Sequence, residues 1–250
     1  MAGFDEAIIL HNQVTDQSPE DVKDVKAQAE WIAEELEALG IKTRMMPFEL
    51  DCAEKLTEAK KRGGCFVLNM VDAAPGEEAN VILAPALLEA VGIPFAGCAS
   101  EALTVTNNKL LTKRLLLSYG MPTPAWLGGD GDFIPGMYLI KPVTEDASVG
   151  LDDQALVMAS SAEALTALTS AREARLQKRC FAERYIDGRE FNVCVYGNTM
   201  NPVVLPPYEW LFPGFSEAGK PRFINYDAKW TEHTFEYDAL AAAYHLPPSS

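Results

Sequence analysis

Short apolar runs alternate with helical periods over the first 97 residues of the chain. The run at residues 7–10 predicts a buried strand. The motif Ser18-Pro19-Glu20-Asp21 predicts a helix start, with an N-cap, a first-turn proline and two carboxylates at the positive helix end. Apolar residues then recur at a helical period: Val22, Val25, Ala29, Ile32, Leu36 and Leu39. Gly40 follows directly and predicts the end of this helix.

The same alternation continues up to residue 97. The predicted elements are a strand at 41–46, a charged helix at 54–62, a strand at 65–68, an apolar helix at 79–91 and a strand or turn at 93–97. Strands that alternate with single helices imply right-handed crossovers and a parallel sheet covered on both faces. We therefore expect the amino-terminal part to be an α/β domain.

From about residue 103 the pattern is typical of antiparallel α+β structure. The predicted elements are a helix at 108–119, an extended stretch at 121–124, a strand at 137–140 and a helix from a capping box at Ser160-Ser-Ala-Glu163 to about Leu176. A strand pair is predicted at 181–186 and 190–196, with further strands at 203–205 and 222–224. The tail is expected to begin as a helix at Tyr237 and to stop at Pro247.

Composition places the chain among ordinary globular proteins, since 48% of its 250 residues are hydrophobic and 23% are charged. Its formal net charge of −15 and the lack of a basic run argue against nucleic acid or an anionic membrane as partner. Acids near the amino terminus and the short apolar run exclude a secretory signal there, so we expect a cytoplasmic protein. Five scattered cysteines without a C-x-x-C motif predict reduced thiols.

One segment matches a nucleotide-binding motif only in part. Residues 214–220 match the opening of a P-loop, but Pro221 stands where a serine or threonine is required and supplies neither a hydroxyl nor a backbone N–H. Lysines and acids spread over the middle of the chain are a subtler set. Lys141 is the most informative of them, because it lies where an apolar strand emerges at a sheet end, whereas Lys109 taken alone is more often a solvated helix lysine.

Six segments in a shared order carry a family resemblance. They are Ile140-Lys-Pro-Val-Thr-Glu-Asp-Ala-Ser-Val-Gly150 and Asn225-Tyr-Asp-Ala-Lys-Trp-Thr231, together with residues 85–97, 107–116, 120–126 and 181–193. Together they cover most of the chain and resemble the D-alanine–D-alanine ligase family of the ATP-grasp superfamily. The resemblance implies a parallel-sheet pre-ATP-grasp domain at 1–104, a small α+β ATP-grasp subdomain at 105–186 and an incomplete second one at 187–250.

The resemblance also implies roles for single residues. Lys109 and Lys141 match lysines that bind the ATP phosphates, and Ser148, Val149 and Gly150 match a flap that closes over them. The adenine would be bound at Glu183, Arg184, Tyr185 and Ile186, and the ribose hydroxyls by Glu190. Ser148 and Lys229 are the implied catalytic residues.

The implied reaction is ATP-dependent carboxylate–amine ligation through an acyl phosphate, with Mg²⁺ and lysines stabilising the transferring phosphoryl group. The resemblance further implies small amino acids or peptides as substrates, cell-wall peptidoglycan synthesis as the setting, and a homodimer as the assembly. The chain departs from the family at Ala147, where a serine is usual, and at Trp230, where a tyrosine is frequent. D-alanine specificity therefore stays open.

We also expect the chain to end before the family's metal-ligating segment, so no metal ligand is assigned. The residues Glu232, His233, Glu236 and Asp238 are expected to be exposed instead. Two alternatives follow: a truncated, non-catalytic nucleotide-binding homologue, or an ATP-grasp ligase for a different amino acid or peptide. The aromatic residues Tyr208, Trp210, Phe212 and Phe215 are expected to pack a loop rather than to form a ligand cage.

Overall fold

The computed structural model describes residues 3–72, 78–198 and 200–244. The chain divides into two compact units. The first comprises Met1–Thr123 with Val143–Asp146, and the second comprises Pro124–Pro142 with Ala147–Ser250. Each unit has its own sheets and its own hydrophobic clusters.

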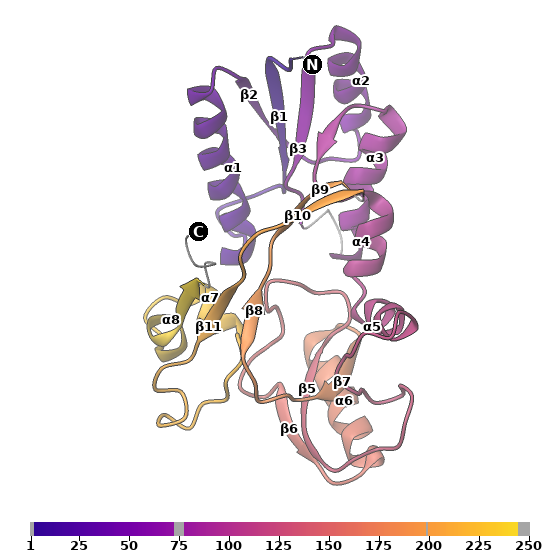
Figure 1. Cartoon of the computed structure of the whole chain (residues 1–250), viewed down its shortest axis with the longest axis vertical. Helices are drawn as coiled ribbons and strands as arrows, with labels where there is room; N and C mark the ends of the chain where they lie inside the picture. Colours follow the sequence, from indigo (N-terminus) through magenta and orange to yellow (C-terminus); the bar gives the residue numbers. More distant parts are fainter. Residues whose placement is uncertain (1–2, 73–77, 199, 245–250) are drawn as a thin grey trace. The chain divides into compact units, whose positions relative to one another are not determined.

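The first unit is an α/β layer built on a four-stranded parallel sheet (Figure 1). Its elements in chain order are β1 Glu6–His11, α1 Glu20–Ala38, β2 Lys42–Pro47, α2 Cys52–Arg62, β3 Cys65–Asn69, the 3₁₀ helix η1 Glu78–Ile82, α3 Leu83–Val91, β4 Phe95–Ala96, α4 Ser100–Thr106 and α5 Lys109–Ser118. The strand order is β2-β1-β3-β4. This arrangement confirms the predicted parallel sheet.

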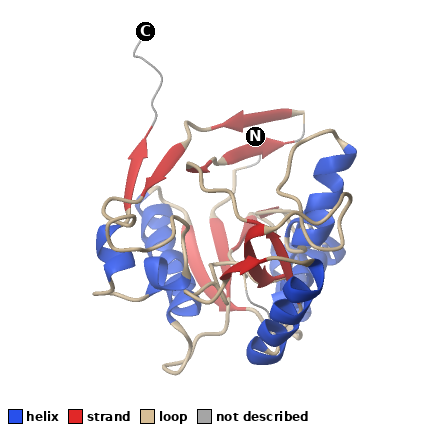
Figure 2. Cartoon of the chain, turned by 90° about the horizontal axis from the view of Figure 1, so that it is seen from below, coloured by secondary structure: helices blue, strands red, loops and turns tan. Residues whose placement is uncertain are grey.

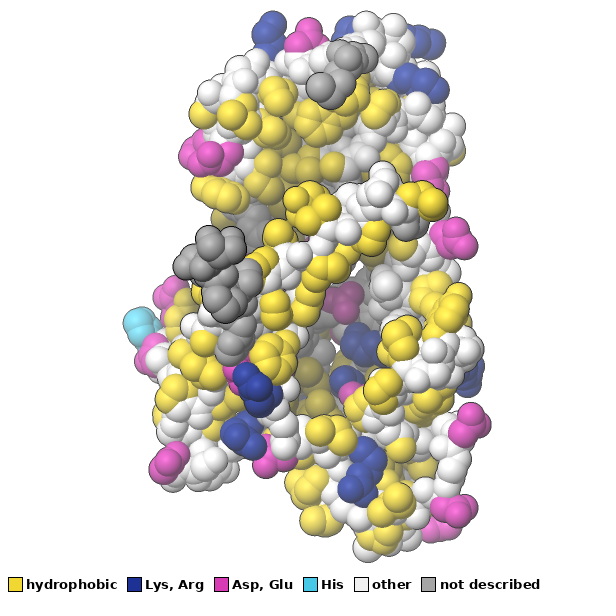
Figure 3. Space-filling model, in the orientation of Figure 1, with side chains coloured by type: hydrophobic (Ala, Val, Ile, Leu, Met, Phe, Trp, Pro, Cys, Tyr) yellow, Lys and Arg dark blue, Asp and Glu magenta, His cyan; other side chains and the backbone are white. Residues whose placement is uncertain are grey.

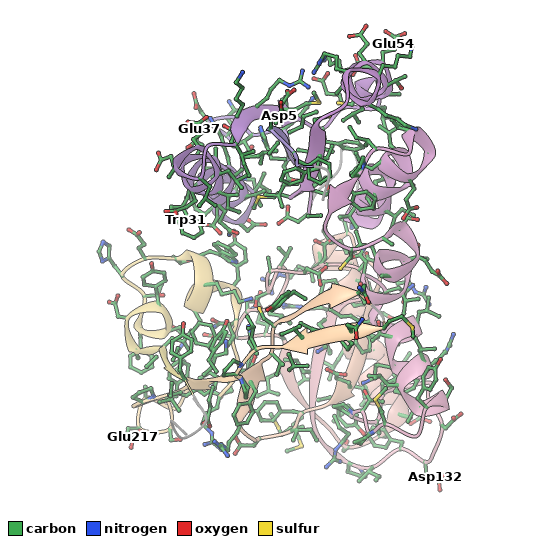
Figure 4. The ribbon with its side chains drawn as sticks, turned by 45° about the horizontal axis from the view of Figure 1, so that its top comes forward. Asp5, Trp31, Glu37, Glu54, Asp132 and Glu217 are labelled. Atoms are coloured by element: carbon green, nitrogen blue, oxygen red, sulfur yellow. The ribbon has the colours of Figure 1, made fainter. Side chains whose placement is uncertain are left out.

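The core of this unit follows from the apolar runs of its central strands. Five consecutive residues of β1, from Ala7 to His11, are buried. Since successive side chains of a strand point to opposite faces, both faces of the sheet are covered. On α2 the buried positions Cys52, Leu56 and Ala59 share one face, while Glu54 projects outward (Figure 4).

Three details of the first unit differ from the predictions. The Ser18 hydroxyl accepts from the Thr15 N–H at 2.9 Å, so it does not cap α1, and Pro19 is the N-cap instead. Leu39 is 77% exposed, because the chain leaves the helix at Gly40. The helix predicted at 79–91 is split into η1 and α3, since Pro85 lacks an N–H and would clash with the preceding turn of a continuous α-helix.

The second unit begins with a small antiparallel sheet. Its elements are β5 Gly136–Pro142, β6 Leu156–Ala159, α6 Ala162–Leu176 and β7 Cys180–Arg184, with the strand order β6-β5-β7. Tyr138 and Ile140 of β5 belong to one buried cluster, and Leu139 between them belongs to another. Because side chains alternate along a strand, β5 separates two apolar layers.

The rest of this unit contains short strands and two short helices (Figure 2). They are β8 Glu190–Asn192, β9 Val195–Asn198, β10 Asn201–Val204, β11 Tyr208–Leu211, α7 Tyr226–Trp230, α8 Phe235–Ala239 and β12 Ala241–Tyr244. One antiparallel sheet has the order β12-β11-β8, and β9 and β10 form a separate hairpin. Figure 3 shows hydrophobic side chains at the surface over this hairpin, where Val195, Tyr196 and Val204 are exposed.

Four predictions in this half are corrected. The side chain that caps α6 belongs to Ser161, which accepts from the Ala164 N–H at 3.2 Å, so the expected box at Ser160 is shifted by one residue. The runs at 181–186 and 190–196 do not pair with one another, because β7 pairs with β5 and β8 with β11.

The segment 222–224 is not a strand, since the Phe223 N–H folds back to the Pro221 carbonyl at 3.2 Å. The tail begins in a helix at Tyr237 as expected, but this helix, α8, ends at Ala239, and the chain then continues as β12, which pairs with β11. The expected stop at Pro247 lies outside the described residues.

The fold class is confirmed: an α/β part with a parallel sheet is followed by antiparallel α+β structure. The threefold division at 1–104, 105–186 and 187–250 stays a prediction. Within the described ranges, none of the helices combines the length and the apolarity needed to cross a bilayer. All five cysteines are free thiols, as expected.

Candidate functional site

A pocket of about 390 Å³ lies in the second unit. Its walls come from β5, the end of β7, the turn that leads to β8 and the segment 222–224. The apolar lining includes Pro124, Leu139, Leu151, Ile186, Phe223 and Ile224. Charged side chains from the same elements converge on it, which is the usual composition of a small-molecule site.

Lys141 and Glu183 form an ion pair in this pocket. They are neighbours across the sheet, because β5 and β7 are paired in antiparallel register and Lys141 lies opposite Phe181. The ammonium group also lies 5.9 Å from the centroid of the Phe181 ring. Only 21% of the Lys141 side chain and 11% of the Glu183 side chain are exposed, so a cation is held in a largely dehydrated place where an anionic ligand would interact with it strongly.

Glu190, the first residue of β8, lines the same pocket. Burial raises the pKa of Glu190, and this effect outweighs the hydrogen bond from the Ile224 N–H and the charges of Lys229 and Lys141, which lower it. Lys229, a residue of α7, is thus one of the charges that act on the Glu190 carboxylate. A carboxylate influenced by two lysines can accept hydrogen bonds from hydroxyl groups, while the lysines attract phosphate.

We expect Glu190→Gln to stabilise the protein near neutral pH and to have little effect at about pH 4. The folded-state pKa is raised, so the stability linked to the protonated group is present below its ordinary value of 4.5 and is lost as the pH rises through the folded value. Thermal unfolding at the two pH values measures this difference. Glu217→Gln is the control, because Glu217 is exposed (Figure 4); equal shifts of the two variants at both pH values would contradict the prediction.

The flap that the resemblance points to is a left-handed turn beside this pocket. Ala147, Ser148 and Gly150 have φ angles of 50°, 63° and 74°. The Ser148 hydroxyl donates to the Ile224 carbonyl at 2.9 Å, and the Trp230 indole N–H donates to the Ala147 carbonyl at 2.8 Å. Val149 is half-buried. The flap is therefore tied to the segment from Ile224 to Trp230, which supplies part of the pocket wall.

The end of β7 and the turn after it contribute charged, aromatic and aliphatic residues to the pocket lining. The Tyr185 hydroxyl donates to the Arg222 carbonyl at 3.1 Å, and burial raises the pKa of Tyr185. Its ring lies edge-on to Phe223, with centroids 6.4 Å apart. The guanidinium group of Arg184 lies over the Tyr138 ring, whose side of β5 is opposite to that of Leu139. The guanidinium group of Arg184 therefore lies on the face of β5 opposite to Leu139, which lines the pocket.

Lys109 lies in the first unit, at the start of α5. The Asn108 side chain caps this helix by accepting from the Leu111 N–H at 3.1 Å. The Lys109 backbone N–H donates to the Val143 carbonyl at 3.0 Å, and its ammonium group donates to the Glu145 carbonyl and lies 3.5 Å from Asp146. Lys109 is thus bound to the segment Val143–Asp146, and the interpretation as a solvated helix lysine is wrong.

The structure brings together Lys141, Glu183 and Glu190 with the charge of Lys229, all from the second unit. Several polar groups around them were not found from the sequence. Arg222 lines the pocket and pairs with Asp187 at 2.7 Å, and Arg189 binds the buried Glu209 through two hydrogen bonds of 2.6 Å. No local pattern marks these pairs, since their partners are 35 and 20 residues apart.

The predictions for the aromatic residues and for the tail acids had different outcomes. Tyr208 packs edge-on to Trp210, and Phe212 packs edge-on to Phe215, so the rings pack against one another, but Tyr208 and Trp210 lie on strand β11 rather than in a loop. Glu236 is buried and pairs with Lys220 at 2.6 Å, so its expected exposure is wrong. Over residues 3–72, 78–198 and 200–244, no three His, Cys, Asp or Glu side chains gather where a metal ion could be held.

Comparisons with known proteins identify relatives of this chain. No protein-family model matches the chain. It is 29% identical over 216 residues to the D-alanine–D-alanine ligase of Sphingopyxis alaskensis, and this alignment covers 82% of this chain and 63% of the relative. It is 30% identical over 203 residues to that of Moorella thermoacetica, covering 72% and 60%. The chain thus spans less than two thirds of the length of these curated relatives.

Solved structures show the same fold. The D-alanyl-alanine synthetase A of Vibrio cholerae superposes with a TM-score of 0.60 at 16% identity, over 99% of this chain and 77% of that chain. The D-alanine–D-alanine ligase of Bacillus anthracis complexed with ATP gives 0.58 at 17% identity, over 97% and 71%. In sequence and in fold, the chain belongs to the D-alanine–D-alanine ligase family of the ATP-grasp superfamily.

Proposed function

We propose that this chain binds ATP in the pocket of its second unit and takes part in ATP-dependent ligation of a carboxylate to an amine. The observation that carries the proposal is the convergence of Lys141 and Glu190 on one partly apolar pocket, with Lys229 acting on the same carboxylate. Apolar walls suit a purine, the acid suits ribose hydroxyls and the lysines suit phosphates. The relatives named above are ligases of this kind.

Within this proposal, the roles divide along the pocket. Leu139, Phe223 and the backbone from Glu183 to Ile186 would enclose the base. Glu190 would accept hydrogen bonds from the ribose, which favours its ionised form on binding. Lys141 would exchange its partner Glu183 for a phosphate oxygen. The family resemblance implies that Lys109 would be a further phosphate lysine.

The proposed chemistry is attack of a substrate carboxylate on the γ-phosphate, followed by attack of an amine on the acyl phosphate. The residues of this chain would supply binding, charge and protection from water. The flap with Ser148, Val149 and Gly150 would exclude water, and Lys229 would hold charge near the transferring group. Mg²⁺ belongs to the proposal through the resemblance, and no step is assigned to it.

The proposal also covers the substrates and the setting. The amine and the carboxylate would come from small amino acids or peptides, as the names of the relatives suggest for those proteins. The work would take place in the cytoplasm, in the supply of peptidoglycan precursors, and the protein would be a homodimer. The three parts at 1–104, 105–186 and 187–250 would correspond to the pre-ATP-grasp domain and two ATP-grasp subdomains.

Two measurements on the whole chain test the proposal. Isothermal titration with ATP, with and without Mg²⁺, should show binding, and ADP should compete with it. Release of phosphate from ATP should then rise on addition of D-alanine. Binding without release under any amino acid would favour the non-catalytic alternative, release with another amino acid would favour a ligase of different specificity, and absence of ATP binding would refute the proposal.

A further inference from the structure

The flap is fixed at both of its ends by groups from distant parts of the second unit. At its beginning, Trp230 and Ser148 tie it to the segment from Ile224 to Trp230. Ala147 and Ser148 have left-handed backbones, a conformation that is unfavourable for residues with a Cβ. Such a conformation persists when surrounding contacts determine it, so the contacts at the other end of the flap matter as well.

At that other end lies Arg172, a residue of α6 of which only 5% is exposed. Its guanidinium group donates to the Gly150 carbonyl at 2.7 Å and pairs with Asp152 at 2.7 Å. Burial raises the pKa of Asp152, but the hydrogen bonds from Arg172 and from the Gln154 N–H outweigh it and leave this pKa below its ordinary value. The buried guanidinium group of Arg172 thus donates a hydrogen bond to a backbone carbonyl of the flap.

The carbonyl of Gly150 belongs to the peptide group that closes the turn. The next peptide N–H, that of Leu151, donates back to the Ser148 carbonyl at 2.9 Å and closes the turn. Holding the Gly150 carbonyl therefore fixes the orientation of the same peptide group whose N–H closes the loop. Leu151 also lines the pocket, so a rotation of this peptide would reach the pocket wall.

We infer that Arg172 is a positioning residue that fixes the Gly150–Leu151 end of the flap through the Gly150 carbonyl. This inference rests on the proposed function for its purpose, but its geometry is independent of any ligand. Within the described part of the chain, Nε and Nη1 of Arg172 have no hydrogen-bond partner. Burying donor groups without partners costs stability, so this arrangement is unfavourable for a residue whose main role is to stabilise the fold. Positioning one carbonyl, in contrast, needs only a single well-directed donor.

Arg175 offers a matched control on the same helix. It binds the other oxygen of Asp152 at 2.7 Å, but its side chain is 48% exposed and its hydrogen bonds go to Asp152 and Gln154 rather than to Gly150. Arg172→Met leaves Asp152 with Arg175 as a partner, so the protein is expected to fold with an unfolding midpoint close to that of the parent. Arg175→Met removes an ion pair with the same carboxylate and spares the flap.

The test is hydrogen–deuterium exchange of the whole chain, read at the backbone amides of residues 147–151. In the absence of nucleotide, Arg172→Met should exchange about tenfold faster or more at these amides, while Arg175→Met should stay within about twofold of the parent. Arg172→Lys, which keeps one donor, should recover part of the protection. Equal exchange in the Met variants of Arg172 and Arg175, or faster exchange throughout α6 as well as the flap, would overturn the inference.

A second readout separates this inference from the proposed function. Titration with ATP should show weaker binding in Arg172→Met than in Arg175→Met, with a smaller nucleotide-dependent protection of the flap. If the parent chain binds no ATP, the proposed function fails, whereas the exchange difference without nucleotide still decides the role of Arg172. If ATP binds equally to both variants while exchange differs, Arg172 positions the flap as inferred but the flap does not contribute to nucleotide affinity.

Discussion

Replacing Lys141 with methionine is expected to lower the affinity for ATP about tenfold or more, equivalent to about 1.4 kcal/mol or more of binding free energy. The ammonium group is largely withdrawn from water, because only 21% of the Lys141 side chain is exposed and the Phe181 ring lies 5.9 Å from it. A charge–phosphate contact in such a place is screened little by salt. Isothermal titration of the whole chain measures the change.

The design must account for Glu183, which loses its lysine partner in this variant. Removing one member of a buried ion pair costs about 3–5 kcal/mol of stability, so Lys141→Met is compared with the double variant Lys141→Met, Glu183→Gln. The double variant should regain stability but not ATP affinity. Lys61→Met, in the exposed last turn of α2, controls for the loss of one positive charge. Parent-like ATP affinity in both Lys141 variants would exclude this lysine from the phosphate site.

Gly150→Ala is expected to destabilise the protein by about 2–5 kcal/mol, the sum of a left-handed backbone penalty and overpacking. Gly150 has a φ of 74°, which disfavours any residue with a Cβ. A Cβ built there would lie 2.9 Å from Cγ of Pro142 and 3.1 Å from Cδ1 of Leu176. The proline ring is rigid, so the backbone of the flap would have to move. Denaturant unfolding gives the loss of stability.

Gly219→Ala separates the two contributions. Gly219 has a φ of 68°, close to that of Gly150, but a Cβ there would meet nothing within 4 Å. This variant should therefore show the backbone penalty alone, about 1–2 kcal/mol. If the two alanine variants lose the same stability, close packing under the flap is not what requires glycine at position 150. A displaced flap in Gly150→Ala should also weaken ATP binding, which Gly219→Ala should leave unchanged.

Local sequence signals predicted most elements that depend on near neighbours. The parallel strands of the first unit were visible as apolar runs, and α1 as a periodic apolar face, because these patterns reflect burial of one short segment. The predictions were wrong where the same segment can adopt two different local structures. Ser160 and Ser161 can both cap α6, and the extended backbone of Ser161 decides between them. The run Ala241–Tyr244 has a helix-favouring composition but becomes a strand because β11 offers it a pairing edge.

The candidate site shows the same division. Lys141 could be singled out because it follows an apolar strand directly, and the order of the motifs pointed to Glu183, Glu190 and Lys229 through the family resemblance. Arg172 and Arg222 could not be found in this way. Each acts on a group more than 20 residues away, and nothing in the neighbouring sequence distinguishes them from exposed arginines.

The sequence by itself determined the order of most helices and strands, the family and the residue types available for phosphate and ribose, since these follow from local periodicity and from motifs in a fixed order. The tertiary structure decided which strands pair, which arginines are buried, and that Lys109 lies in a different compact unit from Lys141. The left-handed flap also belongs to the second group, because its strained backbone is held by contacts from Trp230, Ile224 and Arg172. Such contacts join residues far apart in the chain, and their energies depend on burial and geometry that no local pattern encodes.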